Sequence, residues 1–448
     1  MKLAKDEKQL FLRLFLPALI ETVILRCFNI ADSIMLGQMV DSTTAVAAVG
    51  LCSSPINLIS GVASSFFIGV TATISWLYGA DRKKQMRTVA WQSMTIGSAI
   101  AIFFCAFSVL FSRNIMAFIC KDEQILEIAA SYFRINAYGF LFQILSTNIT
   151  AILRGIGVTK LPMLYNILGG IVNVVLNYLL IYGRLGLPEM RADGAALATS
   201  ISKLVSLVIA LCILFLKDTE VHIKYGLNKK WDKNIRTKMI PIGITSACEQ
   251  ALLQVGAILS AKIVSTLPVS VIAANQVVAS VEGFAWATGS ATQTAITVLF
   301  GRSLGENNAN KAKAFLRYAV KCALLFAFFE MFIFILFGRQ LAITFSNDAS
   351  LYGMISIIFI IASFSLPFIN THQTISGALR SAGDSIAPLI ASLCSLWIFR
   401  VALGYLVVSV LHKGIYVYRI CLLLDQFTRC LMVSIFYLTG HWRKRNRS

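Results

Sequence analysis

Several polar side chains interrupt the long apolar stretches of this sequence, and one of them is a carboxylate. Asp32 lies in the run NIADSIMLG, within an apolar stretch over residues 14–36. A charge near the centre of a membrane helix costs at least about 2.5–3.5 kcal/mol, so such residues usually pair, face a cavity or carry ions. Asp32 could instead be solvated at the membrane edge or pair with Arg26, although residues six positions apart do not share a helix face. We therefore predict a functional role for Asp32.

Two asparagines are spaced so that they share one face of a helix. Asn173 and Asn177 are four residues apart in an apolar stretch over residues 161–183. Two amide oxygens opposite a carboxylate would form an all-oxygen cation site, whereas the alternative role is ordinary hydrogen bonding between helices. The next stretch contains DGAALATSIS, whose small residues permit close helix approach and whose Thr199 can supply a hydroxyl.

The second half of the chain carries a different set of polar residues in its apolar stretches. Glu330 lies in FAFFEMFIFILF among phenylalanines and receives no role from its spacing, and neither does Arg26. Glu21 could extend to the membrane edge or bond a neighbouring helix. The residues that we predict as second-half polar candidates for a site or a cavity lining are Glu249, Glu282, Asn370 and Gln373.

The elements that carry these residues are long apolar segments. Of the 448 residues, 57% are hydrophobic and 14% are charged, and the mean hydropathy is +0.75. Backbone groups in lipid must be paired internally, so segments near 20 residues long predict membrane helices. We expect an all-α polytopic membrane protein, with the two longest stretches able to tilt strongly or to split. The twelve predicted stretches are 14–36, 45–75, 89–111, 126–150, 161–183, 192–216, 237–262, 270–300, 315–337, 351–377, 386–411 and 415–440.

An internal repeat relates the two halves of the chain. The segment ILRGIGVTKLP at 152–162 returns as ALRSAGDSIAP at 378–388, and the arginine, a glycine and the proline recur after 226 residues. Repeats in a strongly apolar chain are typical of transporters. We therefore predict two pseudo-symmetric six-helix lobes, residues 1–216 and 237–448, joined by a polar cytoplasmic linker at 217–236. Because each lobe has an even number of helices, both lobes begin on the same side of the membrane, and the two repeats are therefore parallel.

The distribution of charge predicts topology and excludes other classes of protein. The net charge is +19, yet the basic residues gather in alternate loops and at both ends, as the positive-inside rule requires for cytoplasmic termini. We expect a multi-pass protein of the cell membrane with no nucleic-acid partner. The first stretch carries charges and lacks a cleavage site, so it is not a removed signal. The ten cysteines and four histidines show no zinc-ligand spacing, which argues against a metal site other than Na⁺.

Several short segments stand in order and at matching spacing in both halves of the chain. They are IADSIMLG at 30–37, AVAAVGL at 45–51, YGADRKKQM at 78–86, LRGIGVTKLPM at 153–163, NVVLNYLLIYG at 173–183, DGAALATSIS at 193–202, IPIGITSACEQ at 240–250, VVASVEGFAW at 277–286, LGENNANKAKA at 304–314 and SGALRSAGDSIAP at 376–388. None would suffice alone, but together they resemble the multidrug and toxin extrusion (MATE) family of transporters over about residues 10–440.

The resemblance implies export of amphipathic, chiefly cationic, organic compounds in exchange for Na⁺ or H⁺. It implies that Asp32, Asn173, Asn177 and Thr199 bind the coupling cation, with the Ala195 carbonyl as a further ligand. Some members carry an aspartate in place of Asn177, so the choice between Na⁺ and H⁺ stays open. Adaptable apolar walls suit varied ligands. We predict a monomer without enzymatic activity or cofactor, and a substrate cavity that includes Met35, Phe66, Tyr138, Phe284 and Trp286.

Other functions stay open at this stage. Glu249 occupies the position of an acid that one branch of the family uses in a carboxy-terminal site, but that branch has an aspartate where Asn370 stands. The substrate could be an endogenous metabolite, or the protein could be a flippase for lipid-linked precursors, which has a similar helix count. A membrane enzyme would need clustered catalytic residues, and a channel would need rings of matched residues, which the two halves do not supply.

Overall fold

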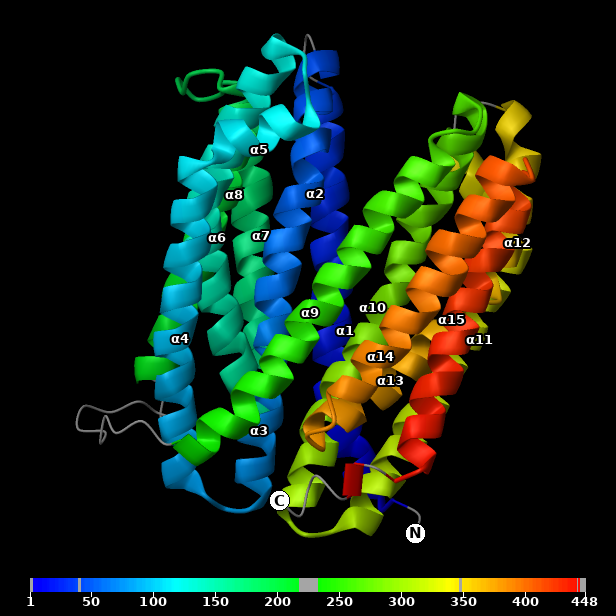
Figure 1. Ribbon diagram of the computed structural model, residues 1–448. Coiled ribbons are helices and arrows are strands. Elements are labelled where there is room, and N and C mark those ends of the chain that lie inside the picture. Colours follow the sequence, from blue (N-terminus) through cyan, green and yellow to red (C-terminus); the bar gives the residue numbers. More distant parts are fainter. Residues whose placement is uncertain (1–2, 39–41, 217–232, 346–348, 441, 444–448) are drawn as a thin grey trace. The chain divides into compact units, whose positions relative to one another are not determined.

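A computed structural model describes residues 3–38, 42–216, 233–345, 349–440 and 442–443. In these ranges all regular secondary structure is helical (Figure 1). The all-α polytopic fold class predicted from the sequence is thereby confirmed. Residues 217–232, which form most of the predicted linker, lie outside the described residues.

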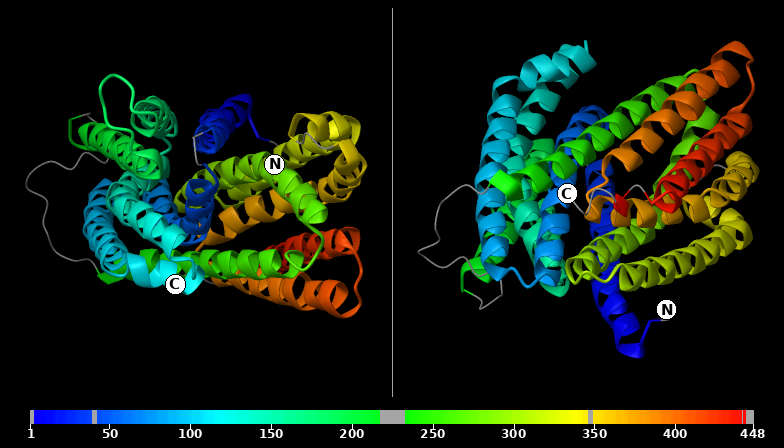
Figure 2. Two further views of the ribbon diagram at one scale, coloured as in Figure 1. Left: turned by 90° about the horizontal axis from the view of Figure 1, so that it is seen from above. Right: turned by 60° about the horizontal axis from the view of Figure 1, so that its bottom comes forward.

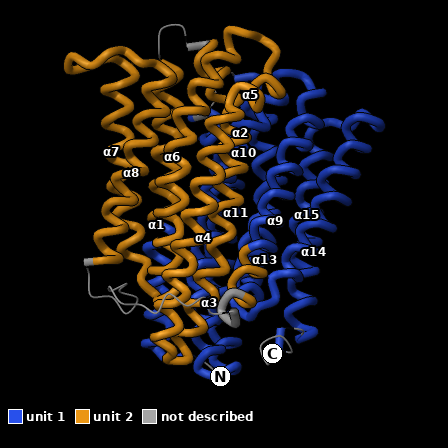
Figure 3. Tube along the Cα trace, turned by 60° about the vertical axis from the view of Figure 1, so that its left-hand side comes forward, with its two compact units in different colours: residues 1–19, 244–448 blue, residues 20–243 orange. Residues whose placement is uncertain are grey.

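The chain divides into two compact units (Figure 3). One unit comprises residues 1–19 and 244–448, and the other comprises residues 20–243. We call them the carboxy-terminal unit and the amino-terminal unit. Helices α1 (Lys5–Gly37) and α9 (Lys233–Val264) each contribute residues to both units. The predicted lobe boundaries at residues 216 and 237 stay a prediction.

The amino-terminal unit contains, besides parts of α1 and α9, seven helices among its described residues. These are α2 (Ser42–Phe66), α3 (Ile68–Gly79), α4 (Lys83–Leu110), α5 (Ser112–Ile119), α6 (Glu123–Gly155), α7 (Lys160–Ile181) and α8 (Arg191–Leu216). The long helices run side by side, as Figure 2 shows for the blue to green ribbons.

The carboxy-terminal unit is built in the same way from the second half of the chain. Its helices are α10 (Val269–Gly305), α11 (Ala309–Phe345), α12 (Tyr352–Ser363), α13 (Leu366–Ser381), α14 (Ile386–Ser395) and α15 (Ile415–Leu438), with a short 3₁₀ turn at Ala349–Leu351 and π-helical segments at Leu396–Leu403 and Leu406–Val410.

The start of α1 packs against α11, although the two are far apart in the sequence. The Phe11 ring meets the Tyr318 ring edge-on at 5.4 Å, and the Phe15 ring lies 5.3 Å from the Phe326 ring. Both phenylalanines are fully buried. This contact places the first residues of the chain in the carboxy-terminal unit, which the repeat in the sequence does not predict.

Helical structure occupies each of the twelve predicted stretches. Within the described residues, ten helical segments are long and apolar enough to cross a membrane. The other two predicted stretches coincide with α1 and α6, which are 33 residues long each. The length and apolar composition of the segments therefore located the helices of this fold.

The two longest predicted stretches differ in whether their helix is continuous. The predicted stretch 45–75 splits at Phe67 into α2 and α3, whereas α10 runs unbroken for 37 residues over the stretch 270–300. Two further irregularities were not expected. The stretch 351–377 breaks before Pro367, because a proline at the start of a helix cannot continue the helix before it. The end of α14 widens into the π-helical turns, a feature common near functional sites.

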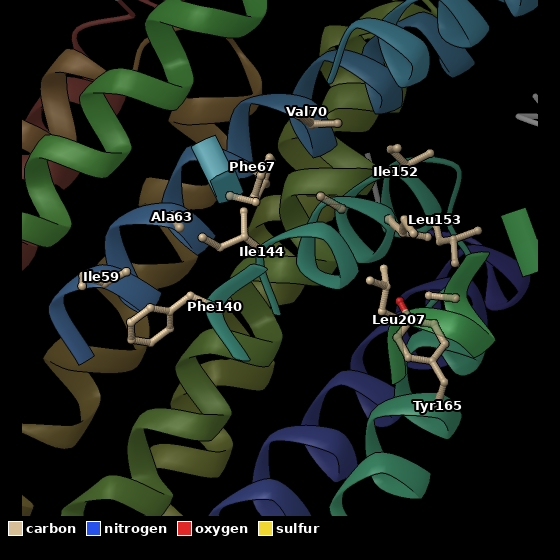
Figure 4. Close-up of a cluster of buried hydrophobic side chains, with 14 of the residues drawn as sticks. Ile59, Ala63, Phe67, Val70, Phe140, Ile144, Ile152, Leu153, Tyr165 and Leu207 are labelled. Carbon is tan, nitrogen blue, oxygen red and sulfur yellow. The ribbon is translucent and has the colours of Figure 1, made fainter. Parts of the chain in front are cut away.

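The core of the amino-terminal unit lies between α2, α3, α4 and α6. Ile59 and Ala63 of α2 face Phe140 and Ile144 of α6 in Figure 4. Phe140 is fully buried and its ring packs edge-on against Phe133 at 6.1 Å. Since lipid is as apolar as these side chains, the contacts act through packing rather than through removal from water. The cluster holds α6 in place beside the helices that carry polar residues.

We expect Phe140→Ala to lower the free energy of unfolding by about 3 kcal/mol, because it opens a cavity in a packed core. Phe103→Ala is the matched control, since its ring is 61% exposed on α4 and should cost under about 0.5 kcal/mol. Thermal unfolding of both purified variants in detergent measures the difference. Equal destabilisation by the two variants would contradict this placement of the core.

Candidate functional site

Two adjacent glycines of α7 allow close contact with two other helices. A side chain on Gly169 would collide with Ser206 of α8, and one on Gly170 would collide with the Phe28 ring of α1. Phe28 lies one helical turn before Asp32. The absence of a side chain at Gly170 therefore lets α1 approach α7 at the level where its carboxylate stands.

The Asp32 carboxylate is surrounded by amides of α7. Asn177 donates from Nδ2 to Asp32 Oδ1 at 2.6 Å. The Asn173 amide, oriented with its nitrogen toward the acid, donates to Oδ1 at 2.9 Å and to Oδ2 at 3.1 Å, and its oxygen accepts from Thr199 Oγ1 of α8 at 3.3 Å. Four of the five predicted coupling residues thus form one hydrogen-bonded group.

The fifth predicted coupling residue, Ala195, lies one turn before Thr199 on α8. It is buried with Leu36 and Ile181, which lie one turn beyond Asp32 and Asn177 respectively. The structure therefore brings all five predicted residues to adjoining turns of α1, α7 and α8. A ligand role for the Ala195 carbonyl stays a prediction.

The amides of this site can present either hydrogen-bond donors or oxygens. Asn177 is 1% exposed, and its Oδ1 has no hydrogen-bond partner. An amide carries a donor end and an acceptor end, so a half-turn of the side chain exchanges the two. Both amides direct N–H groups at Asp32, and a half-turn of either amide would direct its oxygen there instead.

Lys203 is a residue near this site that the sequence analysis missed. It follows Thr199 by one turn on α8, its side chain runs past Gly139 of α6, and its charge interacts electrostatically with Asp32. The spacing of Ala195, Thr199 and Lys203 on one helix face was the available signal.

Glu21 is buried and held by two neighbouring helices. Its Oε2 accepts from Arg154 at 2.9 Å and its Oε1 accepts from Asn166 Nδ2 at 2.8 Å. Only 4% of the residue is exposed. Of the two roles considered for Glu21, bonding to neighbouring helices is the correct one. Arg26, which received no role, is half-buried and leaves its Nε without a partner.

Glu249 is held in the carboxy-terminal unit by an equivalent set of partners. Arg380 donates to its Oε2 at 2.6 Å, and Ser392 donates to its Oε1 at 2.8 Å. Arg380 and Ser392 follow Arg154 and Asn166 of the other unit by the same 226 residues. The repeated arginine thus serves one purpose in both units, which is to neutralise a buried glutamate.

Two more acids of this unit, Glu282 and Asp425, are paired with arginines from the last helices. Arg419 donates to Glu282 Oε2 at 2.8 Å. Asp425 is fully buried, and each of its oxygens accepts from an arginine at 2.9 Å, one from Arg400 and one from Arg429. Arg419 and Arg400 reach their acids from other helical segments, whereas Arg429 lies four residues after Asp425 on α15, a spacing that the sequence analysis did not use.

The remaining predicted polar residues of the second half lie around Glu330. Thr288 donates to Glu330 Oε1 at 2.5 Å, and Asn370 donates to Oε2 at 3.3 Å. Gln373, one turn beyond Asn370, is 7% exposed. The four predicted second-half residues therefore fall into separate places: Glu249 and Glu282 in ion pairs, and Asn370 and Gln373 beside an acid to which no role was given.

The residues predicted to line a substrate cavity are distributed over both units. In the amino-terminal unit, the Met35 carbonyl accepts from the Tyr182 hydroxyl at 2.9 Å, the Phe66 ring packs on Phe67, and Tyr138 is 52% exposed. In the carboxy-terminal unit, Phe284 is half-buried and Trp286 packs edge-on against His372. A shared cavity stays a prediction.

Comparison with curated proteins gives relatives that span nearly the whole chain. A probable multidrug resistance protein NorM of Thermotoga maritima is 28% identical over 436 residues, which is 97% of this chain and 93% of the relative. A protein of the same name from Pasteurella multocida is 27% identical over 412 residues, covering 90% and 86% of the two chains. An uncharacterized transporter YisQ of Bacillus subtilis is 24% identical over 438 residues, covering 96% and 92%.

Solved structures share the fold at low sequence identity. A MOP superfamily transporter from Pyrococcus furiosus superposes with a TM-score of 0.90 at 22% identity, covering 98% of this chain and 96% of that one. An outward-facing multidrug resistance MATE family transporter gives a TM-score of 0.89, also at 22% identity and with the same coverage.

The family model MatE matches residues 17–179 and again residues 245–406. The two matches cover most of the chain and fall one in each half, in keeping with the internal repeat. The first match contains Asp32, Asn173 and Asn177, and the second contains Glu249, Glu282 and Asn370. On this evidence the chain belongs to the MatE family of multi-pass membrane transporters.

Proposed function

We propose that this protein exports amphipathic organic cations in exchange for Na⁺ or H⁺ by alternating access, with Asp32 as the coupling carboxylate. One observation carries the proposal. Glu21, Glu249, Glu282 and Asp425 each contact an arginine, whereas Asp32 contacts only neutral amides among the described residues. An acid whose charge is not cancelled by a contacting arginine is free to take up a mobile cation.

Exchange follows if the coupling cation and the substrate compete for the same negative charge. The cation-free carboxylate attracts a lipophilic cation, and uptake of Na⁺ or H⁺ at Asp32 cancels that attraction, so the substrate leaves. A ligand shifts a transporter between states only if it binds the two states with different affinities. Rotation of the Asn173 and Asn177 amides is one way in which the site can differ between them.

The choice between Na⁺ and H⁺ depends on the net charge of the site. Asn177 is a neutral amide, and Lys203 adds a positive charge that acts on Asp32. Both reduce the attraction for a metal cation, whereas the amide and hydroxyl oxygens favour one. Lys203 also lowers the free-energy cost of an Asp32 carboxylate that holds no cation, since the lysine charge partly compensates the charge of Asp32. This would help the cation-free transporter to change between its two states.

The alternative of a lipid-linked precursor flippase is less well supported. Such a substrate carries a pyrophosphate, which would need cationic side chains that are not already neutralised. In the carboxy-terminal unit, Arg380 and Arg419 each pair with one carboxylate, and Arg400 and Arg429 share Asp425, so most of this positive charge is cancelled. The names of the relatives, which refer to multidrug resistance, favour a xenobiotic substrate, with an endogenous metabolite as the other possibility.

The setting of the protein follows from the same proposal. Exchange against Na⁺ or H⁺ requires a membrane that carries an ion gradient, so we place the protein in the cell membrane. We propose that it acts as a monomer. The alternation of basic loops puts both termini in the cytoplasm. The partners are then a small molecule, the coupling ion and the surrounding lipid, without a catalytic step or a cofactor.

We expect Asp32→Asn to lower ion-driven efflux of a cationic dye from proteoliposomes at least 10-fold, because the amide supplies neither a negative charge for Na⁺ nor a titratable oxygen for H⁺. Glu127→Gln is the matched control, since Glu127 is an exposed acid of α6 in the same unit. Size-exclusion profiles confirm that both variants fold. Full coupled efflux by Asp32→Asn would refute the assignment of the carboxylate.

We also expect a single ion gradient to suffice for efflux in the wild type. One vesicle series carries a Na⁺ gradient with pH clamped on both sides, and the other carries a pH gradient in Na⁺-free buffer. The gradient that drives efflux identifies the coupling ion, and Asp32→Asn should abolish the response to that gradient. Failure of both gradients in the wild type would contradict antiport.

A further inference from the structure

Arg26 carries a positive charge near the middle of α1, and no residue that the structure describes neutralises it. The arginine is half-buried, its Nε has no hydrogen-bond partner, and burial is the one effect that acts on its charge. It lies about three helical turns from either end of the apolar stretch 14–36, too far for its side chain to place the charge in water. An arginine at this depth needs a compensating negative charge.

The two acids of α1 lie on another face of the helix and have other partners. Glu21 precedes Arg26 by five residues and Asp32 follows it by six, so the arginine is turned from each of them by about 120–140°. Arg154 and Asn166 hold Glu21, and amides of α7 hold Asp32. Arg26 therefore points away from the face of α1 that packs on α7.

Lys203 of α8 is a second cation at a similar depth. At one end of the Asp32 site, Leu36 of α1 and Ala195 of α8 lie in the same apolar cluster, so the two helices pass the site in opposite directions. Lys203 lies about 12 Å along α8 from this cluster, and Arg26 lies about 15 Å from it along α1. Both cations thus stand on the side of Asp32 away from the cluster, at depths that differ by about 3 Å.

The acids of α1 cannot balance both of these cations. Glu21 is paired with Arg154, so Asp32 alone remains for Lys203 and Arg26. Lys203 and Asp32 act on each other electrostatically, which leaves one positive charge in excess. Uptake of Na⁺ or H⁺ at Asp32 increases that excess. A substrate with only cationic groups is repelled by it, whereas a substrate that also carries an acidic group neutralises it.

We propose that Arg26 binds the acidic group of the transported compound, which is therefore a zwitterionic amphiphile with a carboxylate besides its cationic group. The inference rests on the function proposed above and names the class of compound within it. A guanidinium is suited to this role, because its planar fork donates two parallel hydrogen bonds to a carboxylate. Partial burial strengthens such bonds, and Lys203 adds to the positive potential. The cationic group of the substrate still competes with the coupling ion for Asp32.

Binding of rhodamine B and of its methyl ester to the purified full-length protein in detergent tests the inference. The two dyes differ in the acidic group alone: rhodamine B is a zwitterion at neutral pH, and the ester keeps only the cationic charge. We expect the wild type to bind the zwitterion about 10-fold more tightly in a fluorescence-anisotropy titration, as one charge-assisted contact provides. Arg26→Gln should abolish this preference by weakening the binding of the zwitterion without weakening that of the ester.

Arg87→Gln is the matched control, since Arg87 is an exposed arginine of α4 in the same unit, and it should bind both dyes as the wild type does. The comparison of the two dyes on the wild type needs no variant, so it holds even if Arg26→Gln fails to fold. Failure of the wild type to bind the zwitterion more tightly than the ester would overturn the assignment, as would a preference that survives in Arg26→Gln. Binding is measured without an ion gradient, so this result is independent of the efflux test of Asp32→Asn.

Discussion

A buried carboxylate in this fold must have its charge compensated, and the way in which each acid meets this requirement organises the rest of the structure. In water the cost of ionisation is met by solvent, but within membrane helices a partner must come from another helix or from a bound ion. Glu21 and Glu249 take an arginine, as do Glu282 and Asp425. Asp32 accepts from two amides and Glu330 accepts from a hydroxyl and an amide, and neither acid contacts an arginine among the described residues.

The arginine pairs act as structural links between helices. Arg154 at the end of α6 reaches Glu21 of α1, and Arg380 at the end of α13 reaches Glu249 of α9. Removing one partner of such a pair would leave an uncompensated buried charge, which costs about 3–5 kcal/mol. The repeated motif LRGIGVTKLP and its copy therefore link an acid-bearing helix to the rest of each unit.

Small residues decide where the chemistry can take place. Gly169 and Gly170 let α8 and α1 approach α7 from two sides, so that side chains from three helices meet at Asp32. Gly289 of α10 lets the amides of Asn370 and Gln373 pack against it in the other unit, where a side-chain carbon would collide with both. In both places the absence of a side chain brings the polar groups together, because helices in a membrane approach most closely at glycine, alanine and serine.

Much of the architecture could be predicted from one sequence. Apolar length located the helices, since each membrane crossing needs about 20 such residues. The helical period put Asn173 and Asn177 on one face, and the cost of buried charge singled out Asp32. The same reasoning placed Glu249 and Glu282 among candidates for a site, because a sequence shows that an acid is in an apolar run and does not show what lies across from it.

The partners of most charges were decided by tertiary structure. The spacing of Asp425 and Arg429 on α15 is local, but nothing in the sequence shows that Arg400 also reaches Asp425 or that Arg419 pairs with Glu282. Likewise nothing in the sequence shows that α10 and α13 bring a threonine and an amide to Glu330. Local sequence determines helix length and face, whereas electrostatic pairing in a membrane depends on contacts between helices that are distant in the chain.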